Sequence, residues 1–161
     1  MNNTITPMNN INFQAKLIIA DLDGNKARLQ NIVKIFEQKT KNFPNDTVIL
    51  SGSFGKNILW ERFNNKQNWI EDDVILQPRL TKALKKLSDT EIAKKFVSIL
   101  KFSNKQGKIE QDTNRLADSL NLNKASLETE TKFYDLMAKL RDSRIAEFKE
   151  KNPIFQKGLI I

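Results

Sequence analysis

In the first half of the chain, the spacing of hydrophobic residues alternates between the two-residue repeat of strands and the three-to-four-residue repeat of helices. Residues 11–21 are apolar and rich in β-branched side chains. They predict a strand that carries on one face Phe13, Ala15, Leu17 and Ile19. Residues 47–53 predict a second short strand, and residues 58–63 are a candidate third strand with Ile58 and Trp60 on one face.

A helix is predicted between the first two strands. Its apolar stripe recurs at intervals of three and four residues and consists of Leu29, Ile32, Val33 and Phe36. Asn25 is a suitable N-cap, because its side chain can accept hydrogen bonds from free backbone amides of the first turn. Pro44 ends the helical stretch. The polar residues 64–73, after the third strand, predict a loop.

From residue 77 onward the spacing of apolar residues is helical almost throughout. The predicted helices cover residues 77–87, 88–102, 109–122 and 125–151. Pro78 fits the first turn of the first helix, and Ser88 with Glu91 forms a capping box for the second. Gly107 is expected to end that second helix. The apolar tail is expected to add a strand or to pack on the core.

These elements predict an α+β protein. A small sheet precedes a C-terminal half of four helices that packs on it. We divide the chain into a flexible arm over residues 1–11, a small α/β unit over 12–76 and a helical half over 77–161. The last two could also form one continuous domain.

The absence of cysteine and histidine narrows the chemistry. It excludes disulfides, thiolate nucleophiles, imidazole bases and zinc sites built from these residues. Neither a metal nor a cofactor is predicted. No apolar run approaches the length of a membrane span, and the N-terminal residues lack the pattern of a secretory signal. Cytoplasm is therefore the expected location.

The net charge of +8 is unevenly distributed along the chain. Residues 1–76 hold nine basic and eight acidic side chains, whereas residues 77–161 hold eighteen and eleven. A basic half can attract nucleic acid or an acidic protein, although a solvated lysine-rich surface has the same composition.

An acidic motif follows the first predicted strand. Asp21-Leu22-Asp23-Gly24 resembles the first motif of the haloacid dehalogenase superfamily. The resemblance implies a magnesium-dependent phosphatase with Asp21 as nucleophile, Asp23 as acid and base, and Ser51 as a phosphate-holding hydroxyl. It also implies that Asp72 and Asp73 supply carboxylates to magnesium. The same string is ordinary turn chemistry, which is the interpretation we favour.

A second motif lies at residues 111–137, which resemble a helix-turn-helix unit. Ala117 takes the small position inside the first helix, and the helix at 88–102 would support the unit. Asn121 replaces the usual glycine of the turn. The resemblance implies DNA binding through Arg115, Lys124 and Lys132, although acidic residues such as Glu128 oppose it. A plain helical packing unit is the alternative.

The function predicted from these patterns is non-enzymatic binding, with a protein or nucleic-acid partner left open. DNA binding through residues 111–137 is the first alternative, and the phosphatase is the second. The apolar residues of the tail are candidates for contact with a protein partner or for docking on the chain's own core. They are Leu159, Ile160 and Ile161.

Overall fold

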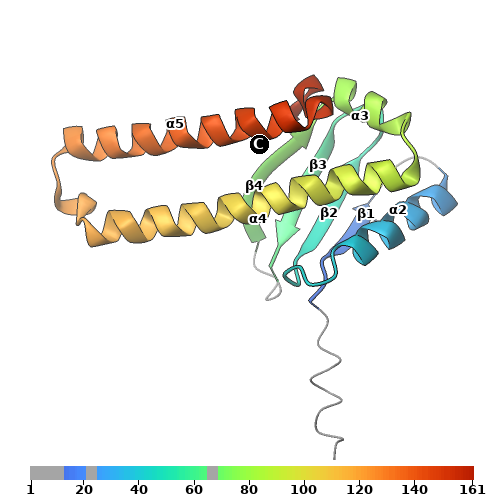
Figure 1. The fold of residues 1–161 in the computed structure, drawn as a ribbon, viewed down its shortest axis with the longest axis horizontal. Coiled ribbons are helices and arrows are strands. Elements are labelled where there is room, and N and C mark those ends of the chain that lie inside the picture. Colours follow the sequence, from blue (N-terminus) through green and yellow to red (C-terminus); the bar gives the residue numbers. More distant parts are fainter. Residues whose placement is uncertain (1–12, 21–24, 65–68) are drawn as a thin grey trace, which may run out of the picture. The chain divides into compact units, whose positions relative to one another are not determined.

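The computed structural model of the chain describes residues 13–20, 25–64 and 69–161, and gives the backbone alone for residues 69–73. A mixed sheet of five strands precedes a helical C-terminal half, which confirms the predicted α+β class (Figure 1). The strands run in the order of the sequence and are β1 (Lys16–Ala20), β2 (Thr47–Gly52), β3 (Ile58–Phe63), β4 (Trp69–Leu76) and β5 (Leu159–Ile160).

β1 and β2 are parallel and are joined by the helix α2 (Lys26–Lys39), as the strand–helix–strand pattern predicts. The remaining neighbours pair in antiparallel fashion. Buried residues pair across the strands, since alternate side chains of a strand point to the same face. The pairs include Leu17 with Val48, Leu50 with Trp60, and Leu76 with both Ile58 and Leu159.

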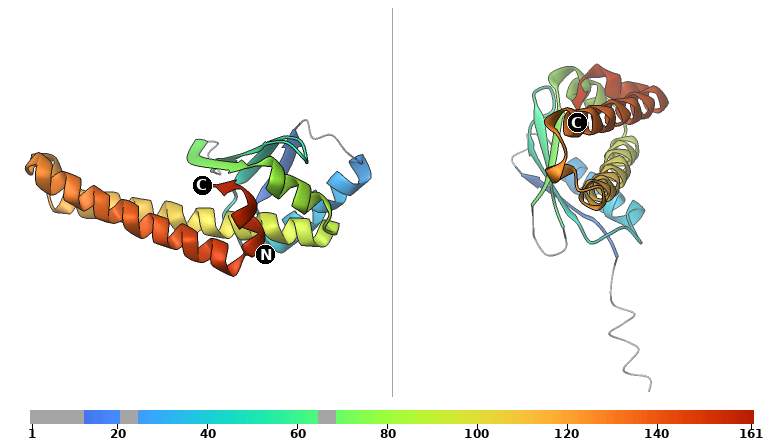
Figure 2. Two further views of the ribbon diagram at one scale, coloured as in Figure 1. Left: turned by 90° about the horizontal axis from the view of Figure 1, so that it is seen from above. Right: turned by 90° about the vertical axis from the view of Figure 1, so that its left-hand side faces the viewer.

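Contacts between Cα atoms divide the chain into two compact units, residues 1–98 with 157–161 and residues 99–156. In the first unit, α2, α3 (Pro78–Lys85) and the first ten residues of α4 (Asp89–Ser119) lie on one face of the sheet (Figure 2). Their buried residues include Phe36, Leu84 and Phe96, and the Phe96 ring meets the Trp60 ring edge-on at 6.3 Å.

The helix starts follow the predicted local chemistry. The Asn25 side chain accepts hydrogen bonds from the backbone amides of Ala27 and Arg28. Pro78 occupies the first turn of α3, and the Ser88 hydroxyl accepts a hydrogen bond from the amide of Glu91 at 3.2 Å. On α2, however, the predicted stripe is fully buried only at two of its four positions, because Leu29 and Val33 are half-buried.

One ion pair is buried in the first unit. The Arg62 guanidinium donates a hydrogen bond to the Asp46 carboxylate at 2.8 Å, and both side chains are less than a tenth exposed. Arg62 shares the inward face of β3 with Ile58 and Trp60. A buried charge needs such a partner, because an unpaired one would be costly to remove from water.

The second unit contains two long helices. Residues 99–119 of α4 and α5 (Leu127–Lys151) run side by side in opposite directions (Figures 1 and 2). They are joined by a short 3-10 turn at Leu122–Lys124. Asn121 takes the left-handed conformation at φ 53°, and Ser126 caps α5 through its hydroxyl. We call this pair of helices the helical hairpin.

Several sequence-based predictions are wrong in detail. Gly107 does not end a helix, so the predicted helices at 88–102 and 109–122 are one helix that ends at Ser119, and the C-terminal half has three α-helices rather than four. Residues 69–73 belong to β4 and not to a loop. Phe13 does not line the core, since it is 59% exposed and precedes β1.

The tail adds the short edge strand β5, one of the two outcomes expected for it. The Gln77 amide donates to the Gly158 carbonyl at 2.8 Å, next to the pairing of β5 with β4. Gly158 has φ 147°, and a Cβ at this position would lie 2.8 Å from the Gln77 Cβ. A glycine is needed here because both the backbone angle and the close approach disfavour a side chain.

Candidate functional site

The residues of the phosphatase motif are only partly described. Asp21 and Asp23 lie outside the described residues, as do the side chains of Asp72 and Asp73, whose backbone lies in β4. Ser51 lies in β2 and pairs in register with Ala20, whereas β3 separates it from β4. Among the described residues there is no group of three or more acidic side chains placed to hold a metal ion. The haloacid dehalogenase resemblance also implies several strand–helix units, whereas in this sheet only β1 and β2 are parallel and joined by a helix.

The predicted helix-turn-helix segment forms the outer part of the helical hairpin. Its two helices run antiparallel, whereas helix-turn-helix units cross at a steep angle. The supporting helix expected at 88–102 is not separate, since it continues into the segment as α4. The left-handed Asn121 does replace the turn glycine as predicted.

The three predicted DNA-contacting residues are exposed. Two of them have acidic neighbours on their own helix: Arg115 lies 3.6 Å from Asp112, and Lys132 lies 3.0 Å from Glu128. Lys124 ends the 3-10 turn. Residues 111–137 hold three basic and five acidic side chains, so this segment is not the source of the positive charge.

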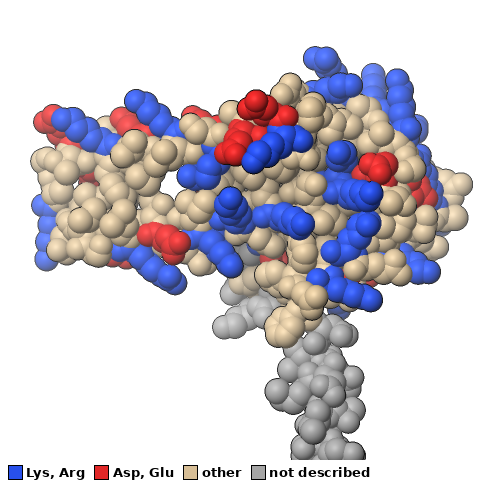
Figure 3. Space-filling model, in the orientation of Figure 1, with Lys and Arg blue, Asp and Glu red and all other residues tan. Residues whose placement is uncertain are grey.

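The positive charge is concentrated in α3 and the start of α4. Residues 77–98 hold six basic and two acidic side chains, whereas the whole second unit holds eleven and nine. The basic residues are Arg79, Lys82, Lys85, Lys86, Lys94 and Lys95. All but the half-buried Lys95 are exposed, and basic side chains gather over α3 at the upper right of Figure 3.

The three tail residues have different surroundings. Leu159 is 1% exposed in the core of the sheet, so its own chain covers it. Ile160 is 45% exposed and pairs with Ile75, which in turn pairs with Leu59. These three residues form a row on the face of the sheet opposite α2 and α3. Ile161 is half-buried.

The helical hairpin exposes most of the large hydrophobic side chains that lie on the surface. Six of the ten that are exposed among the described residues fall between positions 116 and 140. They are Leu116, Leu120, Leu127, Tyr134, Leu136 and Leu140. None of the 25 residues of α5 is buried. Figure 3 shows uncharged surface between two charged rims on this outer part of α4 and α5.

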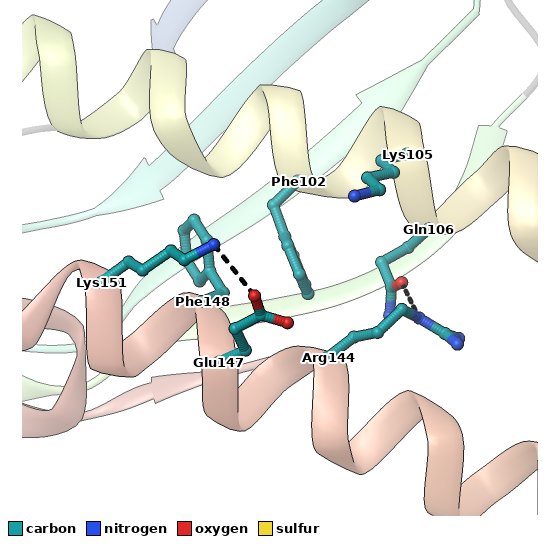
Figure 4. A pocket seen from close by; sticks show the side chains of 7 residues that line it. All are labelled: Phe102, Lys105, Gln106, Arg144, Glu147, Phe148 and Lys151. Atoms are coloured by element: carbon teal, nitrogen blue, oxygen red, sulfur yellow. Dashed lines mark hydrogen bonds and ion pairs between the residues drawn. The ribbon is translucent and has the colours of Figure 1, made fainter.

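Polar side chains line a hollow of about 170 Å³ between the helices of the hairpin (Figure 4). α4 contributes Phe102, Lys105 and Gln106, and α5 contributes Arg144, Glu147, Phe148 and Lys151. The Phe102 and Phe148 rings stack at 4.4 Å, and Phe155 stacks on Phe148 at 5.3 Å. The hollow therefore has an aromatic wall and a charged rim.

Glu147 is ionised at neutral pH. The Lys151 ammonium donates a hydrogen bond to its carboxylate at 2.9 Å, and this bond lowers the pKa of Glu147 below its usual value. The charge of Lys151 acts in the same direction. Burial raises the pKa to a smaller extent, and the charge of Lys105 lowers it least of all. Glu147 in turn raises the pKa of Lys151, mainly through the same hydrogen bond.

A second hollow, of about 260 Å³, lies further along the hairpin and shares Arg144 with the first. Its lining includes Ile109, Tyr134 and Met137 beside the polar Glu110 and Arg141. The Arg141 Nε atom is buried, has no hydrogen-bond partner among the described residues, and lies 3.8 Å from a Glu110 oxygen. The two hollows therefore place charged and amide side chains beside apolar ones in the middle of the hairpin.

Sequence reasoning missed the residues of these hollows, although the pattern contains a signal. Positions that face the partner helix recur every three or four residues, and in a stable pair of helices most of them are apolar. Here α4 has Gln106 and Glu110 at such positions, and α5 has Arg141 and Arg144. Polar residues on both sides of one seam would have indicated a polar site.

Two further findings bear on function. Among the helices of the described residues, none combines the length and apolar character needed to cross a membrane. No protein-family model, curated protein or solved structure matches this chain.

Proposed function

We propose that the protein is a non-enzymatic interaction protein whose helical hairpin pairs with the hairpin of a second copy. The observation that carries this proposal is the concentration of exposed large hydrophobic side chains between positions 116 and 140. A concentration of exposed apolar side chains often marks an interface. Two hairpins that cover each other's apolar sides would form a four-helix bundle, a common arrangement for such helices.

The charges of the hairpin agree with self-association. The charge of the second unit is almost balanced, with eleven basic and nine acidic residues. Several of these residues form ion pairs within one helix. A surface of mixed charge does not select a strongly acidic or strongly basic partner. Leu136 and Leu140 are four residues apart, so they lie on one side of α5 and can contact a neighbouring helix together.

The oligomeric state in solution tests the proposal. Light scattering after size-exclusion chromatography is expected to give a dimer, about twice the chain mass of 18.6 kDa, that dissociates on dilution. Leu140→Lys should give a monomer, because it places a charge in the apolar contact. Ala146→Lys adds the same charge at another exposed position of α5 and should leave the dimer intact. Circular dichroism must show that both variants keep their helices. A wild-type monomer at every concentration would refute the proposal.

A specific observation also favours a second function, binding of nucleic acid by the first unit. The six basic residues between positions 79 and 95 provide a charge excess that residues 111–137 lack. Clustered lysine and arginine side chains attract the phosphate backbone irrespective of sequence. The residues to test are therefore those of α3 and not the predicted set of Arg115, Lys124 and Lys132.

A further inference from the structure

Only one of the two polar atoms of the buried Gln106 side chain has a hydrogen-bond partner. The residue is 5% exposed and lines the smaller hollow of the hairpin. Its Oε1 atom accepts a hydrogen bond from the Arg144 Nε atom at 2.7 Å. Its buried Nε2 atom has no hydrogen-bond partner among the described residues. A buried donor without an acceptor is unfavourable, and native structures contain few of them.

Arg144 fixes which end of the Gln106 amide remains without a partner. Arginine can only donate hydrogen bonds, so the atom of Gln106 that faces it must be the oxygen. The NH2 group is then the end of the amide that has no partner among the described residues. The hollow therefore contains a donor whose direction is set by the neighbouring helix.

The charges around the hollow favour an anion. Lys105, Arg144 and Lys151 carry three positive charges, and Glu147 carries one negative charge. Lys151 is paired with Glu147 at 2.9 Å, whereas Lys105 has no ion-pair partner within 4 Å among the described residues. The Lys105 side chain points toward Phe102 in Figure 4, so α4 contributes both this positive charge and Gln106 to the lining of the hollow.

The walls limit the kind of anion. The stacked rings of Phe102 and Phe148 favour an apolar group, and the Glu147 carboxylate opposes a doubly charged one. The volume of about 170 Å³ is below the roughly 300–1,000 Å³ of typical small-molecule sites. We propose that the hollow binds a single carboxylate on a short apolar stem. The carboxylate would accept from Gln106 Nε2 and lie near Lys105, while the stem would pack on the rings.

Such a carboxylate has two sources, a free small acid or a glutamate side chain of a peptide. This inference goes beyond the proposed self-association, because the hollow lies at residues 102–106 and 144–151 and the exposed leucines lie between 116 and 140. Each can therefore fail without the other. The probes are butyrate for the free acid and the capped tripeptide Ala-Glu-Ala for the side chain.

Nuclear magnetic resonance of the full-length, 15N-labelled protein provides the test. Each probe is titrated at constant ionic strength, with butyramide and inorganic phosphate as comparison ligands. We expect at least one carboxylate probe to cause saturable shifts of the Gln106 side-chain NH2 signals and of the amides of Phe102 and Phe148, with a millimolar dissociation constant. Butyrate alone would identify a free acid as the source, and the tripeptide alone would identify a side chain.

Two variants and a control separate binding from general charge effects. Gln106→Met removes the donor at similar volume and should weaken binding at least about tenfold, the usual effect of losing a hydrogen bond to a charged group. Lys105→Met changes an exposed residue and should weaken binding about twofold to fivefold. Because the change is on the surface, this variant still tests the proposal if Gln106→Met does not fold. Gln111→Met, at an exposed position of α4, should change nothing.

The proposal is overturned by any of three results. The first is no saturable shift with either carboxylate probe in the wild-type protein. The second is equal binding of phosphate or butyramide, which would show that neither the single charge nor the carboxylate is recognised. The third is wild-type affinity in Lys105→Met and also in Gln106→Met, provided that Gln106→Met folds. That result would place the probe elsewhere.

Discussion

At the scale of single residues, Arg28 joins α2 to the connection between α3 and α4. Its Nε atom donates to Asp89 at 2.6 Å, and its two terminal nitrogens donate to the carbonyls of Lys85 and Leu87. Asn31 donates to the second oxygen of Asp89 at 3.0 Å. Asp89 thus accepts hydrogen bonds from two side chains of α2 while it begins α4.

The pKa of Asp89 is lowered by this arrangement. The hydrogen bond from Asn31 is the largest cause, followed by the hydrogen bond from Arg28, and the charge of Arg28 adds to both. Burial raises the pKa by less than either hydrogen bond lowers it, and the charge of Arg28 has the smallest effect. Since the folded pKa lies below the usual value of 3.8, Asp89 binds its proton less readily in the folded state than in the unfolded state.

The first prediction concerns Asp89→Asn. This variant should lower the free energy of unfolding at pH 7 by about 1–2 kcal/mol, because it removes charge-assisted hydrogen bonds. The difference from wild type should be constant above about pH 5 and shrink as the pH falls below roughly 4, since the wild-type carboxylate then becomes protonated. Urea unfolding between pH 2.5 and pH 7 measures both effects.

Glu91→Gln provides the matched control in the same turn of α4. Glu91 lies 3.5 Å from Lys94, and both side chains are about half exposed. Exposed pairs of this kind stabilise little, so the expected loss is under about 0.5 kcal/mol. Equal losses for the two variants would indicate that helix-end electrostatics, rather than the contacts with α2, explain the effect.

At the scale of elements, local chemistry predicts helix starts better than helix ends. Asn25 and Ser88 cap their helices as expected, because a cap acts within three residues. Gly107 was expected to end a helix, yet α4 passes through it. Glycine weakens a helix by only about 1 kcal/mol relative to alanine, and the packing of a long helix can outweigh that cost.

The second prediction compares two glycines. Gly107→Ala should raise the free energy of unfolding by about 0.5–1 kcal/mol, because Gly107 lies inside α4 and alanine favours the helix. Gly52→Ala should lower it by more than about 1 kcal/mol. Gly52 has φ +124°, and a Cβ there would lie 2.1 Å from the Asn57 carbonyl oxygen. Thermal and urea unfolding measure both changes.

The two results test separate statements. A loss of stability with Gly107→Ala would mean that α4 packs too closely against a neighbour at this position to accept a methyl group. Little effect of Gly52→Ala would mean that the turn between β2 and β3 relaxes easily and does not fix their register.

β4 shows where strand prediction fails. Residues 69–73 contain Glu71, Asp72 and Asp73, so the apolar alternation that predicts strands is lost. Trp69 and Ile70 pair with β3, and the register shifts between them and Val74, so the strand continues through the acidic residues in spite of their composition. A partner strand is a long-range influence, and a single stretch of sequence does not contain it.

At the scale of the whole molecule, periodicity was sufficient for the fold class but not for the candidate site. The change from strand to helix spacing near residue 77 predicts the order of sheet and helices that the structure shows. The hollow at Gln106 depends on Arg144, which lies 38 residues away on another helix. Such a contact follows from how α4 and α5 pair. The prediction of two separate helices at 88–102 and 109–122 concealed that pairing, because it broke α4 beside Gln106.

The distribution of charge also becomes clear only once the units are known. Dividing the chain at residue 77 assigned the basic excess to the entire second half. The compact units instead assign most of it to residues 77–98, while residues 99–156 are nearly neutral. The nucleic-acid hypothesis therefore moves from the hairpin to α3 and the start of α4.

The third prediction tests this assignment with a fluorescein-labelled DNA duplex of about 20 base pairs. Wild-type protein should bind at low salt, and the logarithm of its affinity should fall linearly with the logarithm of salt concentration, because bound lysines release counterions. The combined change of Lys82, Lys85 and Lys86 to alanine should flatten that slope by up to about three units, one for each lost phosphate contact. Fluorescence anisotropy at several salt concentrations gives the slopes.

The combined change of Arg115, Lys124 and Lys132 to alanine removes the same number of positive charges and is the matched control. It should leave the slope within about one unit of wild type, because two of these residues already pair with acidic neighbours in a segment with excess acidic residues. If this second variant flattened the slope and the first did not, the helix-turn-helix prediction would be restored. An absence of binding by the wild-type protein at about 50 mM salt would exclude nucleic acid as a partner, since phosphate contacts are strongest there.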